Sequence, residues 1–180
     1  MGRALVIVDI QKDYFPGGAH PLEAPEAAAA AARRVLEAFR ASGDPVVHVR
    51  HVWDEEEATF MRPETEGVDI HPDVAPAEGE LVIAKEHPNG FRETLLEHEL
   101  RARGVDSLVV CGMMTSMCVD ATVRAAVDLG FDTTVVHDAC ATSDLQFDGR
   151  SVPAPEVHAA FLAALGDGYA TVVSSDEIAG

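Results

Sequence analysis

Short runs of apolar, β-branched residues recur along the chain, and segments with helical spacing separate them. The first run, Arg3 to Val8, places apolar residues in succession instead of alternating them with polar ones, which is typical of a strand buried on both faces. Strands that alternate with helices, with few hairpin signals, indicate a parallel sheet. The sequence therefore predicts a three-layer, doubly wound α/β fold with a six-stranded parallel sheet.

The same patterns place the individual elements. Strands are expected over residues 3–8, 45–52, 80–84, 107–110, 132–136 and 169–173, and helices over residues 25–42, 93–103, 115–129 and 154–165. Residues 53–77 are acidic, contain prolines and lack periodicity, which is the composition of a long functional loop. A chain of 180 residues suits one substantial core, so we expect a single domain over residues 1–180.

The chain is strongly acidic. It has 31 Asp and Glu residues against 13 Lys and Arg residues, a formal net charge of -18, which argues against a nucleic-acid partner. The first residues lack the pattern of a signal peptide and no apolar run reaches membrane-spanning length, so we expect a cytoplasmic protein without a membrane partner. Cys111, Cys118 and Cys140 show no CxxC spacing, so neither a disulfide framework nor a dithiol redox motif is indicated.

Three reactive side chains follow predicted strands. Asp9 and Lys85 each come directly after a strand, and Cys118 lies where the strand after Ser107 turns into a helix. Each of these residues, taken alone, could have a purely structural role. The carboxyl ends of parallel strands, however, form one edge of the sheet, where ligands bind in such folds. We therefore expect the three side chains to meet there.

Together these groups can hydrolyse an amide without a metal or cofactor. A helix N-terminus and a nearby ammonium from Lys85 would lower the pKa of the Cys118 thiol and favour a thiolate. Asp9 would accept the thiol proton and return it to a departing amine. The backbone N–H groups of Met114 and Cys118 would face the developing oxyanion.

Four segments in this order resemble a known family, the isochorismatase-like cysteine hydrolases, which include nicotinamidases and carbamoylsarcosine amidase. The segments are LVIVDIQKDYF (5–15), KEHPNGFRETLL (85–96), VVCGMMTSMCVDATVRAA (109–126) and VVHDACAT (135–142). The resemblance implies a triad of Asp9, Lys85 and Cys118. It also implies a cis peptide bond between Met113 and Met114, the six-stranded parallel fold, and dimers or larger homo-oligomers.

Two departures from the family patterns narrow the expected substrate. Nicotinamidases carry a metal site after the second strand, whereas here His48 and His51 would face opposite sides of a strand, so no metal site is expected. His71 is expected to order its loop. True isochorismatases cleave a vinyl ether and lack the cysteine found here as Cys118. The sequence therefore favours a small-molecule amide or carbamoyl compound as substrate.

The resemblance also implies contacts with the substrate. The candidates are Gln11, Phe15, His20, Trp53, Phe60, Asn89 and Phe91. The three phenylalanines have packing as their alternative role. Cys111 is expected to be buried and inert, whereas Cys140, placed after the fifth strand, has either a packing role or a role in the site.

Three other functions compete with the amidohydrolase. A strand-end Asp also occurs in haloacid-dehalogenase phosphatases, but the second Asp of that motif is replaced by Gln11, which weakens a magnesium site. A reactive Cys118 would also suit a thiol sensor of peroxides or electrophiles. The last alternative is a binding module on an inactive hydrolase fold, in which Cys118 would be dispensable.

Overall fold

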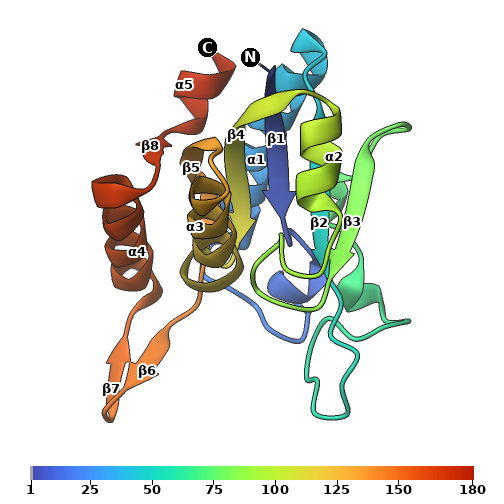
Figure 1. Cartoon of the computed structure of the whole chain (residues 1–180). Helices are drawn as coiled ribbons and strands as arrows, with labels where there is room; N and C mark the ends of the chain where they lie inside the picture. Colours follow the sequence, from blue (N-terminus) through green and yellow to red (C-terminus); the bar gives the residue numbers. More distant parts are fainter. Residues whose placement is uncertain (1) are drawn as a thin grey trace.

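The computed structural model describes residues 2–180, and its centre is a six-stranded, all-parallel sheet (Figure 1). The predicted fold class is confirmed. The strand order is β3-β2-β1-β4-β5-β8. The strands are β1 (Gly2–Val8), β2 (Val46–His51), β3 (Leu81–Lys85), β4 (Val105–Met113), β5 (Asp132–Ala141) and β8 (Thr171–Val173).

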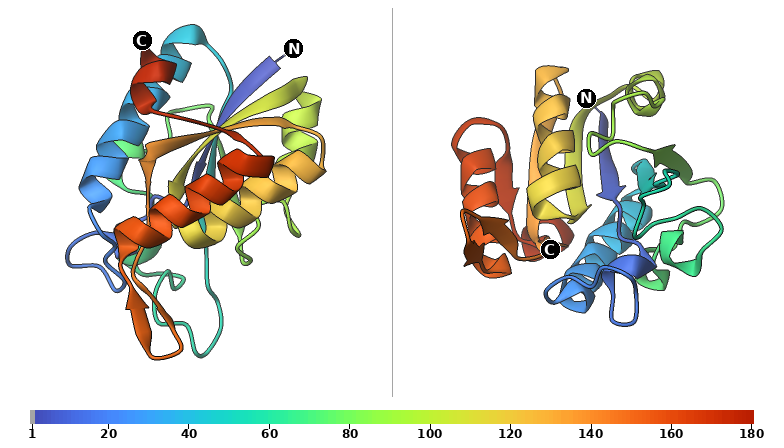
Figure 2. Two further views of the ribbon diagram at one scale, coloured as in Figure 1. Left: turned by 90° about the vertical axis from the view of Figure 1, so that its left-hand side faces the viewer. Right: turned by 90° about the horizontal axis from the view of Figure 1, so that it is seen from below.

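Helices cover both faces of the sheet and complete three layers. The helices α1 and α5 pack on one face, and α2, α3 and α4 lie on the other (Figure 2). Their bounds are α1 (Pro25–Ser42), α2 (Leu96–Ala102), α3 (Asp120–Asp128), α4 (Ala154–Gly168) and α5 (Ser175–Ala179). Single helical turns occur at η1 (Lys12–Tyr14), η2 (Glu66–Val68), η3 (Pro72–Val74) and η4 (Thr115–Val119).

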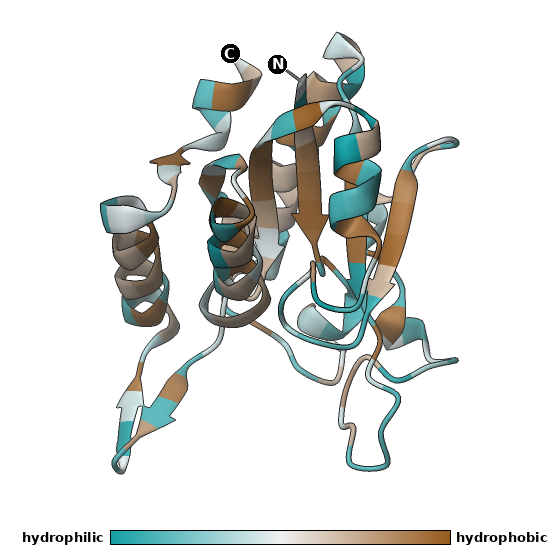
Figure 3. Ribbon diagram, viewed as in Figure 1, coloured by the Kyte–Doolittle hydropathy of each residue, from teal (hydrophilic) through white to brown (hydrophobic). Residues whose placement is uncertain are grey.

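The core lies around β1 and β4, the two central strands. Residues 4–8 of β1 and 108–113 of β4 are almost fully excluded from solvent, as expected for strands that helices cover on both sides. Figure 3 shows apolar strands, with polar loops gathered at the edge toward which the strand arrows point. Within residues 2–180, every helix is too short or too polar to cross a membrane.

The sheet order places the loops after β1 and β4 beside each other. From β1 the chain proceeds outward through β2 and β3, and then returns to the other side of β1 with β4. The carboxyl ends of β1 and β4 therefore form the point where the strand order reverses, which is where open α/β sheets bind ligands. Asp9 follows β1, and Cys118 follows β4 in the turn η4.

Two predicted helices have different bounds in the structure. The helix expected over residues 93–103 begins only at Leu96, because residues 89–95 form turns in which Asn89 and Thr94 bond the local backbone. The helix expected over residues 115–129 begins with a π-helical turn, η4, before α3. Helical periodicity does not distinguish these turns from regular helix, which explains both differences.

The strands β4 and β5 are longer than predicted, and β5 contains Cys140, which was expected after the strand. Two elements were not predicted at all. A hairpin of β6 (Leu145–Phe147) and β7 (Arg150–Val152) projects from the body of the molecule (Figure 1), and the short helix α5 packs against α1. Three-residue strands are too short to produce a period-two pattern, which explains the missed hairpin.

Candidate active site

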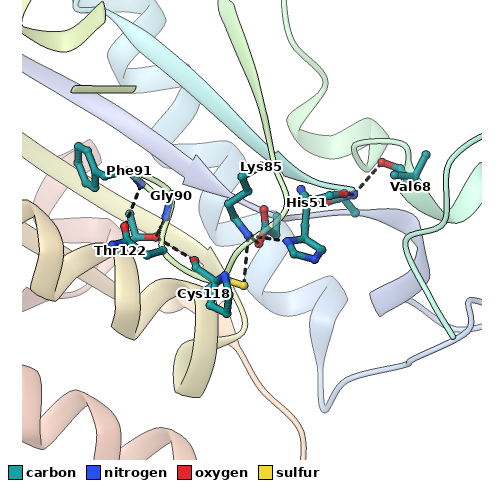
Figure 4. Close-up of polar contacts among 11 residues, drawn as sticks. His51, Val68, Lys85, Gly90, Phe91, Cys118 and Thr122 are labelled. Atoms are coloured by element: carbon teal, nitrogen blue, oxygen red, sulfur yellow. Dashed lines mark hydrogen bonds and ion pairs between the residues drawn. The ribbon is translucent and has the colours of Figure 1, made fainter. Parts of the chain in front are cut away.

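Asp9, Lys85 and Cys118 come from three different strand ends and meet in one buried cluster. Lys85 Nζ lies 2.6 Å from Asp9 Oδ2 and 3.3 Å from Cys118 Sγ. All three residues are at least 96% excluded from solvent. Figure 4 shows Lys85 and Cys118 turned toward each other. The structure thus brings together the three reactive side chains that the sequence placed at strand ends.

The backbone around Asp9 fixes its side chain at the end of β1. Asp9 has a φ of 51°, in the left-handed region, and its N–H donates to the carbonyl of Val49 on β2. A short polar side chain tolerates this conformation better than a branched one. β1 therefore ends at Val8, and the backbone of Asp9 is fixed against β2 while its carboxylate contacts Lys85 at the end of β3.

Hydrogen bonds from several elements hold the turn that contains Cys118. The carbonyl of Met114 accepts the N–H groups of Met117 and Val119, and Thr115 Oγ1 lies 2.9 Å from His158 Nδ1 of α4. Ser116 Oγ lies 2.8 Å from Thr142 Oγ1, just after β5. The peptide bond between Met113 and Met114 is cis, at the place that the family resemblance implied.

The sequence expectation of a lowered thiol pKa is wrong for this geometry. Burial raises the pKa of Cys118 well above its ordinary value, and the negative charge of Asp9 raises it further, while Lys85 lowers it only in part. Burial alone would lower the pKa of Lys85, but Asp9 and Cys118 raise it above its usual range. The resting site therefore holds a protonated thiol beside an ammonium.

His51 also belongs to this cluster, although the sequence considered it only as a metal ligand. Its Nδ1 lies 3.0 Å from Lys85 Nζ, and Figure 4 shows the ring beside the end of the Lys85 side chain. Burial, and then the charge of Lys85, lower the pKa of His51 to about 4, so the ring is neutral near pH 7. Its place in the sequence could have indicated this role, because His51 is the last residue of β2, next to the ends of β1 and β3.

Asp9, His51 and Cys118 each offer a ligand atom, and these atoms lie within 4.8 Å of one another. Such a group resembles a metal site, but the ammonium of Lys85 lies within hydrogen-bond distance of all three side chains. The place where a cation would sit between them is thus taken by a side chain of this protein. The donor set fits an ammonium-centred cluster better than a metal centre.

The other two histidines considered for metal binding lie in separate contacts. His48 is buried with its Nε2 at 2.8 Å from Glu80 Oε2, while His51 of the same strand contacts Lys85. His71 stacks on Phe15, with ring centroids 3.7 Å apart, and its Nδ1 accepts the N–H of Asp73. His71 therefore orders its loop, in agreement with the expectation from the sequence.

Three of the predicted substrate contacts form one aromatic cluster. The rings of His20 and Phe60 stack with centroids 4.8 Å apart, and Trp53 meets Phe60 edge-on at 5.4 Å. Tyr14 contacts both His20 and Phe60, and its pKa is raised by burial and then by the nearby Cys118 and Asp9. Tyr14, which the sequence did not single out, thus belongs to the aromatic cluster and lies near enough to Cys118 and Asp9 for their charges to affect it.

The remaining four candidates for substrate contacts have protein partners elsewhere. Phe15 packs on His71, Asn89 Oδ1 accepts the N–H of Phe91, and the Phe91 ring stacks on Phe131. Figure 4 shows Phe91 beyond Gly90 and Thr122 from Cys118. Gln11 is completely buried and bonds only backbone groups. Each of these four side chains thus has a partner within the protein.

The other two cysteines are buried outside the cluster. Cys111 lies within β4 and is fully buried, which raises its pKa well above the ordinary value. Cys140 Sγ lies 3.3 Å from the carbonyl oxygen of Val136, and burial raises its pKa to about 12. Burial thus disfavours the thiolate form of both cysteines.

Comparison with known proteins identifies the family and the fold of this chain. A family model described as the isochorismatase domain matches residues 3–177. The chain belongs to the isochorismatase family. The isochorismatase family protein YddQ of Bacillus subtilis (strain 168), described as uncharacterized, is 51% identical over 176 residues, which cover 98% of each chain.

Solved structures of the isochorismatase family share the whole fold. The crystal structure of a hydrolase assigned to this family from Oleispira antarctica has a TM-score of 0.95 at 50% identity, over 99% of this chain and 97% of that one. N-carbamoylsarcosine amidase from Thermoplasma acidophilum has a TM-score of 0.83 at 30% identity, over 100% of both chains. Isochorismatase-family relatives of this chain thus include an amidase.

Proposed function

We propose that this protein is a cysteine-dependent amidohydrolase that cleaves a C–N bond, amide or carbamoyl, in a small molecule through a thioester. The observation that carries the proposal is the buried contact of Asp9, Lys85 and Cys118 at the point where the strand order reverses. A thiol, a carboxylate and an ammonium in contact supply a nucleophile, a general base and a fixed positive charge.

Because burial and the charge of Asp9 raise the pKa of Cys118, we propose that Asp9 acts as the general base in the first step. The carboxylate takes the thiol proton as Sγ attacks the carbonyl carbon of the substrate, so that no free thiolate is needed in the resting enzyme. The carbonyl oxygen becomes an oxyanion, which the N–H groups of Met114 and Cys118 are positioned to bind in this proposal. One such donor is typically worth about 3 kcal/mol in the transition state.

Collapse of the tetrahedral intermediate breaks the C–N bond. Protonated Asp9 gives its proton to the leaving nitrogen, which departs as ammonia or an amine and leaves an acyl or carbamoyl thioester on Cys118. Water then attacks the thioester carbon while Asp9 accepts a proton from it. The C–S bond breaks, the proton returns to sulfur, and the product leaves as an acid, so the thiol and the carboxylate are restored.

Two further observations support C–N bonds and small substrates. N-carbamoylsarcosine amidase, similar over the full length of both chains, is an amidase by name. The partly exposed rings of His20, Trp53 and Phe60 offer flat apolar surfaces for a small ligand, and the buried Tyr14 packed against them is near enough to Cys118 and Asp9 for their charges to raise its pKa. Of the seven candidates from the sequence, we propose His20, Trp53 and Phe60 as the substrate contacts.

The test is a screen of small primary amides and carbamoyl compounds for release of ammonia, with Cys118→Ala as the control. We expect turnover by the wild type only, and an acyl adduct on the peptide that contains Cys118 in quenched reactions analysed by mass spectrometry. Turnover that survives in Cys118→Ala would overturn the cysteine mechanism. Oxidation of Cys118 by peroxide without any amide turnover would favour the thiol sensor instead.

A further inference from the structure

The ammonium of Lys85 has three N–H groups and can only donate. Three acceptors surround it, with Asp9 Oδ2 at 2.6 Å, His51 Nδ1 at 3.0 Å and Cys118 Sγ at 3.3 Å. Because the Lys85 side chain is completely buried, water does not replace a lost partner at no cost. Each of the three contacts therefore contributes to the orientation of the ammonium.

This geometry determines which nitrogen of His51 carries the ring proton. An ammonium gives a hydrogen bond but cannot receive one, so Nδ1 of His51 accepts and must be unprotonated. In a neutral ring the proton is then on Nε2. Lys85 thus holds the imidazole of His51 in the Nε2–H tautomer.

The backbone of His51 is fixed by a second buried side chain. Gln11 Oε1 accepts the N–H of His51, and Gln11 Nε2 donates to the carbonyl of His51, both at 2.8 Å. The next residue is anchored as well, since the N–H of Val52 donates to the carbonyl of Lys85. The imidazole therefore extends toward Lys85 from a backbone that is bonded to β3 and to the segment that follows β1.

We infer that His51 is a positioning residue, which keeps the Lys85 ammonium beside Cys118 Sγ while Asp9 carries a proton. The inference rests on the proposed function, in which Asp9 takes the thiol proton and so loses the charge that attracts Lys85. At that stage sulfur becomes negative or bonded to substrate, and the neutral acceptor at His51 still holds the ammonium in place.

The first experiment measures the tautomer of His51 and needs no substrate. Two-bond ¹H–¹⁵N correlation spectra of the ¹⁵N-labelled protein distinguish protonated from unprotonated ring nitrogens. We expect His51 to be neutral near pH 7, with the proton on Nε2, and to lose this single-tautomer pattern in Lys85→Met. A proton on Nδ1, or a doubly protonated ring near pH 7, would overturn the inference.

The second experiment uses p-nitrophenyl acetate as an acyl donor and follows release of p-nitrophenol. The rate that depends on Cys118 is the difference between the wild type and Cys118→Ala. In His51→Leu, which removes the acceptor, we expect this rate to fall by about tenfold or more. In His51→Asn, whose side-chain oxygen can take the place of Nδ1, we expect most of the loss to be recovered.

His48→Gln is the matched control, because His48 lies on the same strand but contacts Glu80. We expect its rate to stay at the wild-type value. Thermal unfolding of all variants separates a folding defect from a positioning defect. Equal rates in His51→Leu and the wild type, with both proteins folded, would overturn the inference. A wild-type rate no higher than that of Cys118→Ala would count against the proposed function and leave the tautomer result to decide on the contact itself.

Discussion

The ammonium of Lys85 and the carboxylate of Asp9 lie 2.6 Å apart, and both side chains are completely shielded from solvent. Two opposite charges removed from water at this distance stabilise each other, but each is costly to leave without its partner. This ion pair joins the ends of β1 and β3, two strands separated in the sheet by β2. Its consequences for stability and for reactivity can be tested separately.

For stability, we expect Asp9→Asn and Lys85→Met each to lower the free energy of unfolding by about 3 kcal/mol or more, because each leaves a buried charge without its partner. The double variant should lose less stability than the sum of the two single losses, since it leaves no unpaired buried charge. Urea unfolding of the four proteins measures the three differences. Additive losses would contradict a direct interaction between the two side chains.

For reactivity, the same two variants should have opposite effects on Cys118. Asp9 raises and Lys85 lowers the pKa of this thiol. Iodoacetamide reacts with the fraction of thiolate present at equilibrium, unlike the proposed amide cleavage, in which Asp9 takes the proton during attack. Alkylation near pH 7 should therefore be faster in Asp9→Asn and slower in Lys85→Met than in the wild type. Peptide mass spectrometry follows Cys118 separately from Cys111, which serves as the internal control. Changes in the same direction in both variants would be evidence against this electrostatic account.

The sequence predicts where these residues lie but not all of their chemical properties. Asp9, Lys85 and Cys118 could be placed at one edge because apolar runs of β1, β3 and β4 mark strand ends, and a parallel sheet aligns those ends. The direction of the Cys118 pKa could not be predicted, since it depends on how deeply the thiol is buried and on its distance from Asp9. Periodicity reports neither quantity.

The sequence did not predict contacts between side chains that are distant along the chain. Gln11 and Phe91 were expected to contact the substrate, and the structure adds that Gln11 bonds the backbone of His51 and that Phe91 stacks on Phe131. Such contacts depend on how loops fold over the sheet, and loop conformation leaves little periodic signal. The hairpin of β6 and β7 was missed for a different reason, because strands of three residues are too short to show a period-two pattern.

A substitution at Gly112 would test the close approach of β4 to β1. It has a φ of +139°, and a Cβ built there would lie 1.9 Å from the carbonyl oxygen of Val8. We expect Gly112→Ala to destabilise the protein by about 3 kcal/mol or more, because a backbone atom cannot yield as a side chain can. Gly168→Ala, at the end of α4 with open space around it, is the control and should leave the urea midpoint almost unchanged.

The pH dependence of stability should report the neutral state of His51. Its pKa is about 4 in the folded protein and 6.5 as the ordinary value. Between these values the unfolded chain binds a proton that the folded protein does not, so stability falls as the pH drops from 6.5 to 4. His51→Asn removes this titration, so the decline of stability with falling pH should become shallower, by up to the slope that one proton contributes. Urea unfolding across this range measures it, and an unchanged slope would mean that His51 is not held neutral.

Gln11 also connects two distant parts of the chain. Besides bonding the backbone of His51, its side chain donates to the carbonyl of Val68, in the long segment between β2 and β3. One amide group thus connects that segment to the residue that contacts Lys85. Loosening of residues 66–70 is therefore expected to loosen the end of β2 as well, which hydrogen exchange of the His51 N–H would report.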